Sequence, residues 1–281
     1  MDIFFIHIKN LTFLAFFWQA YLYLVNTFLQ TFLTAGQDGL HLIATAVLPV
    51  LFPFFVLTSL ILNLANNSRP WLAVLLSYFS GYPNGARLTQ DLYLRNRINL
   101  KQAQNLSIIT STPSPIFVIA TAGTIFLQDI KLGCVIFFCT VGSALINGLI
   151  WRTKPEPEPV TIPIAPKQVP SFFEAFSNAL SSATSAIINV CGVILFFYIT
   201  TRLLNLGPIL TGILEMTSGV AKTTNPFLVQ FFVTFGGLSV AMQQQIFMQN
   251  FQIKFQTYLV YKITHALLAC ALLAICLLFL N

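Results

Sequence analysis

The stretch SGYPNGAR, residues 80–87, interrupts an apolar segment that carries no charged residue from position 70 to position 86. Pro83 has no backbone N–H with which to continue a helix, and Gly81 and Gly85 accept backbone dihedrals that other residues avoid. The stretch therefore predicts a helix that unwinds inside the apolar segment and restarts after Pro83.

The composition places such apolar segments in a membrane. Of the 281 residues, 56% are hydrophobic and only 8% are charged, whereas a soluble domain carries about 25% charged residues. A crossing helix needs about 20 mostly apolar residues. Charge-free stretches near or above that length occupy 10–37, 39–68, 102–128, 132–151, 175–201, 223–253 and 263–281. These observations exclude a soluble globular enzyme and a disordered chain, and they predict a multi-pass, all-α helical bundle in the cell membrane with about six spans.

A proline-rich polar segment, RTKPEPEPVTIPIAPKQVP at 152–170, divides the chain. Its prolines prevent regular helix or sheet, so it is expected to be an extended linker outside the bilayer. It separates a first membrane half, 1–151, made of a leading helix and one repeat, from a second membrane half, 171–281. In each half a spanning helix is followed by a glycine-broken segment and then by another spanning helix, which indicates an internal duplication.

Individual helices are expected within 10–35 and 40–64 and over 132–151, about 185–205 and about 256–280. Ser171–Thr184 is expected to approach the membrane along its interface. Asn99 followed by Gln102 resembles a helix start, because the Asn side chain accepts a free backbone N–H and the Gln side chain reaches back to the cap.

The distribution of basic residues suggests an orientation. If 70–101 and 226–253 are re-entrant hairpins and the N-terminus is cytoplasmic, most Lys and Arg residues lie on the cytoplasmic side, as the positive-inside rule expects. The five residues counted on the opposite side are Lys131, Arg202, Lys222, Lys254 and Lys262. The two halves would then be inverted copies, as in many secondary transporters.

The first break is a candidate solute site. Irregular backbone at membrane depth is tolerated only where protein buries it or where it lines a wet cavity, and a restarted helix offers free N–H groups to an anion or carbonyl. Backbone N–H groups near Pro83–Gly85 would receive the solute, helped by the side chains of Ser80 and Asn84, and Arg87 would offset negative charge. The alternative is a bend used only for packing.

The second break, FGGLSVAMQ, contains Gly236, Gly237, Ser239 and Gln243. Ser239 and Gln243 lie four residues apart, on one helical face, where their hydroxyl and amide groups can bind a polar solute. Backbone N–H groups over 237–239 would contribute as well. The alternative is a glycine-mediated helix contact, which is common in membranes.

Two further stretches are candidates. GILEMTSG carries Glu215 on a short apolar segment, and an ionisable residue inside a membrane is costly, which makes it a functional hypothesis. Glu215 could take a coupling proton or cation, or it could simply lie in water at the interface. The stretch from Thr112 to Ser114 and Pro115 offers two hydroxyls and freed carbonyls, or it is an ordinary proline kink.

No motif of an enzyme or of a metal or cofactor site is present. The sequence lacks a nucleophile elbow, an HExxH helix and a phosphate-binding loop, so no catalytic residue, metal or cofactor is expected. The five cysteines lie in apolar segments without metal-binding spacing. The basic residues lie between apolar segments, which favours membrane orientation over nucleic-acid binding.

Several motifs in order resemble the YlbJ/SpoVV group of sporulation-type integral membrane proteins. These are SGYPNGARLTQDLY, INLKQAQNLSIITSTPSPIF, GILEMTSG and FGGLSVAMQ, and the resemblance runs from about Pro49 to the C-terminus. That group carries the nucleoside-recognition or Gate domain, which is also found in concentrative nucleoside transporters and in the ferrous-iron transporter FeoB. The chain departs from the group's pattern at Ser111-Thr112, where an Asn pair is usual, and at Ala241, where a His is frequent.

The resemblance implies an inverted-repeat fold with two hairpins and a solute site between them. It also implies transport of a small polar molecule; sporulating members are associated with supplying dipicolinate to spores. The expected function is therefore alternating-access transport of a nucleoside-like solute or a small organic carboxylate by a protein embedded in lipid, either as a single chain or as a homo-oligomer. The alternative is a non-transporting membrane partner that helps to assemble another complex. The candidate solute-binding residues are Ser80, Gly81, Tyr82, Pro83, Asn84, Gly85, Arg87, Thr112, Ser114, Glu215, Thr217, Ser218, Gly236, Gly237, Ser239 and Gln243.

Overall fold

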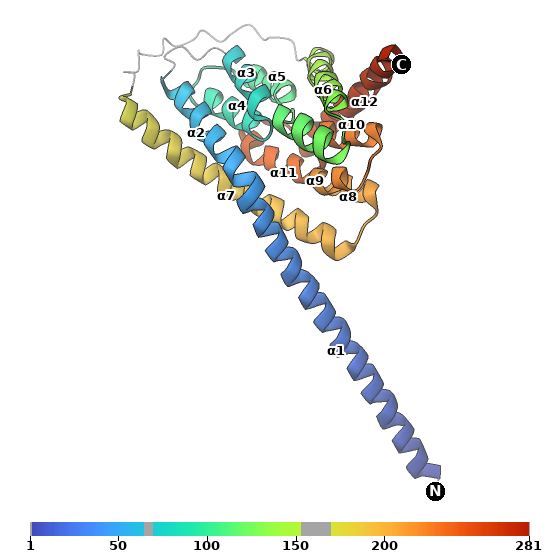
Figure 1. Ribbon diagram of the computed structural model, residues 1–281. Coiled ribbons are helices and arrows are strands. Elements are labelled where there is room, and N and C mark those ends of the chain that lie inside the picture. The colour runs from blue at the N-terminus through green and yellow to red at the C-terminus, as the bar shows by residue number, and fades with distance from the viewer. Residues whose placement is uncertain (1, 65–69, 153–169, 281) are drawn as a thin grey trace.

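The computed structural model describes residues 2–64, 70–152 and 170–280. Within these ranges all the regular secondary structure is helical and there is no strand, which confirms the all-α fold. Four helices are long and apolar enough to cross a membrane, and a bent pair near the N-terminus makes a fifth crossing if it is counted as one. The chain is therefore a polytopic membrane protein (Figure 1).

The described elements lie on the two sides of the linker. The first half contains α1 (Asp2–Leu42), the π-helical segment η1 (Ile43–Val47), α2 (Leu48–Leu64), α3 (Pro70–Ser80), α4 (Asn84–Leu94), α5 (Leu100–Ile109), the π-helical segment η2 (Ile116–Phe126) and α6 (Ile130–Ile150). The second half contains α7 (Phe172–Leu204), α8 (Pro208–Leu214), α9 (Met216–Ala221), α10 (Pro226–Phe235), α11 (Gly237–Met248), the 3₁₀ turn η3 (Gln249–Phe251) and α12 (Phe255–Leu280). The predicted linker lies almost wholly outside the described residues.

Local sequence signals set several of these boundaries. Asn99 and Gln102 form the predicted capping box at the start of α5, with Asn99 Oδ1 accepting from Gln102 N at 2.8 Å. Asn225 caps α10 and is followed by Pro226 at the first helical position, where the missing N–H of proline has no intrahelical partner to lose. Gly236, with φ of 84°, ends α10 in the left-handed conformation that glycine adopts without strain.

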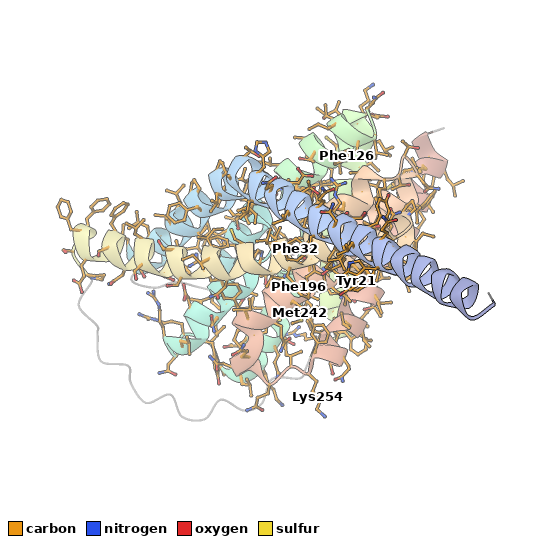
Figure 2. The ribbon with its side chains drawn as sticks, turned by 90° about the horizontal axis from the view of Figure 1, so that it is seen from below. Tyr21, Phe32, Phe126, Phe196, Met242 and Lys254 are labelled. Atoms are coloured by element: carbon orange, nitrogen blue, oxygen red, sulfur yellow. The ribbon has the colours of Figure 1, made fainter. Side chains whose placement is uncertain are left out.

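The N-terminal helices differ from the expected pair over 10–35 and 40–64. α1 runs unbroken to Leu42, and the chain then bends by 46° between Trp18–Thr45 and Leu48–Leu64 through η1. α1 packs across α7 at Gly39, and its N-terminal part projects away from the other helices (Figures 1 and 2). α7 is also continuous, so Ser171–Thr184 does not form a separate interfacial segment; Ser171 caps its first turn.

The hairpins differ from the predicted pair. α3 and α4 pack against each other as expected, but the second reversal lies at Glu215, where Gly212 of α8 meets Gly219 of α9. α10 and α11 instead continue across the Gly236 break as one apolar stretch, Pro226–Phe251, which is long enough to cross the membrane. The hairpin predicted at 226–253 is therefore wrong. The side of the membrane predicted for the residues after it depended on that hairpin and is no longer supported. The span count is also lower than predicted, because the turn at 110–115 divides 102–128 into the short helices α5 and η2.

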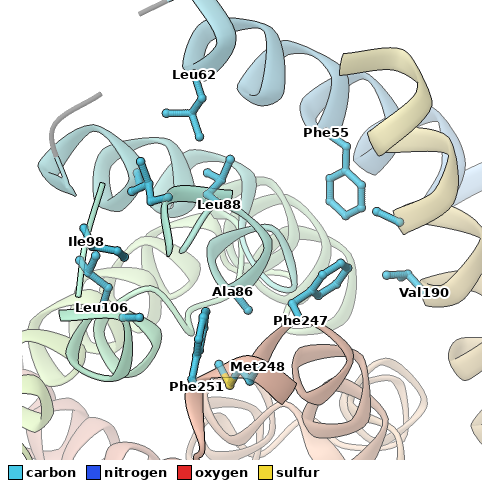
Figure 3. Close-up of a cluster of buried hydrophobic side chains, with 14 of the residues drawn as sticks. Phe55, Leu62, Ala86, Leu88, Ile98, Leu106, Val190, Phe247, Met248 and Phe251 are labelled. Carbon is cyan, nitrogen blue, oxygen red and sulfur yellow. The ribbon is translucent and has the colours of Figure 1, made fainter. Parts of the chain in front are cut away.

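Elements from the two sides of the linker pack on each other. α2 lies along α7 and α6 lies along α12, while α4 contacts α11 and η2 contacts α9. Two buried apolar clusters hold this arrangement. The first, shown in Figure 3, brings Phe55 of α2 and Val190 of α7 onto Phe247 of α11. The second joins η2 and α6 to α9 and α10. Both clusters cross between the halves, so the broken helices meet in the middle of the packed bundle.

Candidate functional site

Tyr82 connects the broken segments of the two halves. Its backbone N–H donates to Thr112 O at 2.7 Å, which ties the α3–α4 turn to the α5–η2 break. Its hydroxyl donates to Val233 O of α10 at 2.8 Å and lies 2.6 Å from Met216 Sδ at the start of α9. One buried residue thus contacts the break at 110–115 through its backbone, and the break at Glu215 and the turn before Gly236 through its side chain.

A cavity of about 300 Å³ lies beside Tyr82. Its polar side chains come from both halves, and they are Ser80, Tyr82, Ser114, Thr121, Glu215, Thr217 and Gln243. Its apolar wall includes Leu42 and Val47 at the α1–η1 bend and Ile194 of α7. An apolar pocket with a few convergent polar groups is the usual form of a small-molecule site, and this volume is at the lower end of the common range of about 300–1,000 Å³.

Glu215 is the one charged residue on the cavity wall, and it is buried. Its Oε1 accepts from Thr217 N at 3.0 Å and its Oε2 from Ser218 N at 2.6 Å, so the carboxylate caps α9. An acid at a helix N-terminus is favoured by the free N–H groups and the helix dipole. Glu215 therefore lies in the protein at the cavity and not in interfacial water, which was the alternative considered above. Thr217 lines the cavity, whereas Ser218 contributes its backbone N–H to the cap.

The glycines of both breaks serve close packing and do not line the cavity. A Cβ on Gly81 would lie 2.3 Å from Ser114 N, and one on Gly85 would lie 2.4 Å from Thr110 O. A Cβ on Gly237 would lie 3.1 Å from Leu214 O, and Gly236 faces Val240 of its own helix. These backbone positions were predicted to receive the solute. In the structure they pack against neighbouring segments instead.

Arg87 and Asn84 form a buried cluster that does not line the cavity. The Arg87 side chain is 2% exposed, and it donates to Ser59 Oγ at 2.6 Å and to Phe55 O at 2.8 Å. It also donates to Asn84 Oδ1 at 3.0 Å, while Asn84 Nδ2 donates to Ser80 Oγ at 2.8 Å. The guanidinium therefore donates its hydrogen bonds mainly to α2 and does not line the cavity where a solute would bind.

The remaining candidates lie close to the cavity. Gln243 Nε2 donates to Ser239 Oγ at 3.2 Å, as their four-residue spacing predicts, and of the two only Gln243 lines the cavity. Ser114 Oγ accepts from Phe117 N at 3.2 Å at the start of η2. Thr112 is fully buried, and its Oγ1 has no hydrogen-bond partner. Pro83 caps α4 beside Tyr82.

Sequence reasoning missed a second polar group, on α12. Lys262 and His265 are both buried. Lys262 Nζ donates to Ser111 O at 2.8 Å, and His265 Nε2 hydrogen-bonds to Thr140 O at 3.0 Å. The topology prediction counted Lys262 only as a charge on or near the non-cytoplasmic side, whereas in the structure its side chain is buried among the helices. The signal that could have found it was a lysine at the eighth position of a 26-residue apolar helix. The described residues contain no group of three or more His, Cys, Asp or Glu side chains suited to a metal ion.

The fold and this cavity define a class, a polytopic helical membrane protein whose broken helices meet at an internal cavity. The chain is 23% identical to the sporulation integral membrane protein YlbJ of Bacillus subtilis (strain 168), over 85% of this chain and 76% of that protein. This similarity confirms the resemblance to the YlbJ-like group that the motifs indicate. No family model matches the chain. No solved structure matches it either.

Proposed function

We propose that this integral membrane protein moves a small polar or anionic solute, nucleoside-like or a small organic carboxylate, by alternating access. The observation that carries the proposal is the cavity beside Tyr82, whose polar side chains come from broken helices of both halves. In secondary transporters the solute binds where discontinuous helices of two repeats meet, and rocking of one repeat against the other exposes it to each side. The resemblance to YlbJ-like proteins supports the same proposal.

An inverted repeat requires that α5 and η2, each too short to cross alone, cross the bilayer together as one broken crossing. Each half would then have two crossings and a broken crossing around a hairpin: α2, α5 with η2, and α6 in the first half, and α7, α10 with α11, and α12 in the second. Three crossings are an odd number, so the second copy runs in the opposite direction across the bilayer.

The lining of the cavity suggests how the solute is held. Most of the wall is apolar, which suits a ring, while Ser80, Ser114 and Gln243 offer hydroxyl and amide groups to a few polar atoms. Glu215 repels an anionic solute unless its own charge is neutralised. A carboxylate solute would therefore enter with a proton or cation bound at Glu215, which makes this residue the proposed coupling group.

Binding and uptake by the purified protein test the proposal. The protein is reconstituted in vesicles and screened by thermal shift against nucleosides and small aromatic and aliphatic carboxylates, because a ligand that binds only the folded state raises the melting temperature. Solutes that bind are then tested for uptake. We expect Gln243→Leu to lose at least tenfold in affinity, and the exposed Gln256→Leu on α12 to behave as the wild type.

Two results would contradict the proposal. One is equal affinity in Gln243→Leu and Gln256→Leu for a solute that binds. The other is a protein that binds and takes up no solute of these classes but co-purifies stoichiometrically with another membrane protein, which would support an assembly partner.

A further inference from the structure

Lys262 is a buried cation about two turns into α12. Its side chain is 2% exposed, its Nζ donates to Ser111 O at 2.8 Å, and it lies 5.5 Å from the centroid of the Tyr82 ring. Among the residues that the structure describes, no carboxylate lies at ion-pair distance from this ammonium. A buried charge without a counter-ion is costly, so the groups around it have to compensate for it in some other way.

The compensation comes from the break between α5 and η2. α5 ends at Ile109, and the last carbonyl groups of a helix have no intrahelical partner and carry partial negative charge. After the end of α5, the carbonyl of Thr112 accepts from Tyr82 N and the carbonyl of Ser111 accepts from Lys262. Lys262 thus meets the negative end of a broken helix inside the bundle.

The surroundings of Ser111 are rich in acceptors. Ser111 Oγ lies 2.7 Å from Tyr258 Oη and accepts from Gln244 Nε2 at 2.9 Å. The Oε1 of Gln244 and the Oγ1 of Thr112 are buried without a hydrogen-bond partner. Carbonyl, amide and hydroxyl oxygens of this kind attract a cation and offer little to an anion.

The matching break in the second half is satisfied differently. The carbonyl of Val233, in the last turn of α10, accepts from the Tyr82 hydroxyl. The same tyrosine presents its ring face to the Lys262 ammonium, which adds a cation–π attraction. Tyr82 therefore joins the Lys262 position to the α10 break and to the cavity.

Unwound carbonyls and helix C-termini at such breaks are the places where transporters coordinate a free cation. We propose that the Lys262 ammonium occupies the position at the α5–η2 break where a free alkali cation would otherwise bind. The chain itself thus supplies the cation at this break. One consequence, that no alkali cation has to be carried at this break, rests on the proposed transport function. The binding claim itself does not.

Lys262→Ala tests the claim by emptying the position. This variant lacks the last three carbons and the nitrogen of the side chain, which is the skeleton of propylammonium. We expect its melting temperature in detergent to fall by roughly 2–10 °C. Propylammonium chloride or NaCl should restore at least half of this loss, whereas tetramethylammonium chloride, which has no N–H and is bulky, should not. Lys254→Ala, an exposed lysine just before α12, is the matched control and should show neither effect.

Two outcomes would overturn the assignment. The first is a Lys262→Ala or Lys262→Met protein as stable as the wild type. The second is a destabilised Lys262→Ala protein that all these salts affect equally. If neither variant can be purified, Glu215→Gln protein with Lys262 intact provides a separate test. Its melting temperature should be equal in NaCl, KCl and choline chloride at one concentration, and selective stabilisation by Na⁺ would show that a metal ion still binds there.

The two proposals fail separately. A protein that binds no solute but shows the propylammonium rescue contradicts the transport proposal and supports the assignment of Lys262. A protein that takes up solute but shows no rescue contradicts the assignment and supports transport.

Discussion

Removing the hydroxyl of Tyr82, with Tyr82→Phe, should loosen the contact between the two halves. The substitution keeps the ring against Lys262 but leaves Val233 O, which accepts from the hydroxyl at 2.8 Å, without its partner in a buried site. An unsatisfied buried acceptor costs about 1–3 kcal/mol, which is roughly a 5–150-fold change in an equilibrium constant. We expect the melting temperature to fall and the affinity for a cavity ligand to decrease within that range, because the ligand contacts side chains from both halves.

The assay is thermal unfolding of the purified protein with and without a ligand found in the solute screen. Tyr23→Phe is the matched control, because Tyr23 on α1 is 71% exposed and removing its hydroxyl disturbs no packed contact. If Tyr82→Phe keeps both the stability and the ligand affinity of the wild type, the hydroxyl does not hold the two breaks together and the reasoning is refuted.

Three further predictions follow from the geometry. Gly85→Leu should abolish uptake, because its Cβ would lie 2.4 Å from Thr110 O, whereas Gly192→Leu, with no atom within 4 Å, should insert and transport normally in the same vesicle assay. Arg87→Ala should lower the free energy of unfolding by about 3–5 kcal/mol, because Asp91, whose Oδ2 lies 3.9 Å from Arg87 Nη1, loses its charge partner. The folded fraction should bind solute with unchanged affinity, and a specific loss of affinity would place Arg87 at the site. Glu215→Gln should retain solute binding but lose acceleration of uptake by an imposed proton or cation gradient, and a variant driven as well as the wild type would remove Glu215 from the coupling role.

The helical membrane fold follows directly from the composition. Charge-free stretches and the low proportion of charged residues require helices that satisfy their own hydrogen bonds in lipid. The breaks at Gly81–Pro83, 110–115 and Gly236 could also be located, because proline and glycine change the backbone locally. The cap at Asn99 could also be predicted, because it depends only on the side chains of Asn99 and Gln102.

The direction of the chain after each break could not be predicted from the residues at the break alone. Whether a broken segment turns back or continues depends on which surfaces pack together. The chain turns back at Glu215 because two glycines, Gly212 and Gly219, let α8 and α9 approach closely. It continues at Gly236 because α10 and α11 both pack into the bundle.

The site was predicted in part. Ser80, Tyr82, Ser114, Glu215, Thr217 and Gln243 do line one cavity, although they are distant in sequence. Arg87 was misplaced because the sequence gives no sign that Ser59 and Phe55 O of α2 would take its donors. Lys262 was overlooked because its partners, Ser111 O and the Tyr82 ring, are brought to it only by the packing of α12 against the other half.

Photo-crosslinking from position 82 tests the central claim most directly. p-Azidophenylalanine, close to tyrosine in size, is placed at residue 82, and the irradiated protein is digested and analysed by mass spectrometry. Because the Tyr82 hydroxyl lies at Met216 and Val233, we predict covalent links from residue 82 to peptides containing these two residues, and none from the same probe at exposed Tyr23. Links confined to the first half or to lipid would show that the broken helices of the two halves do not meet.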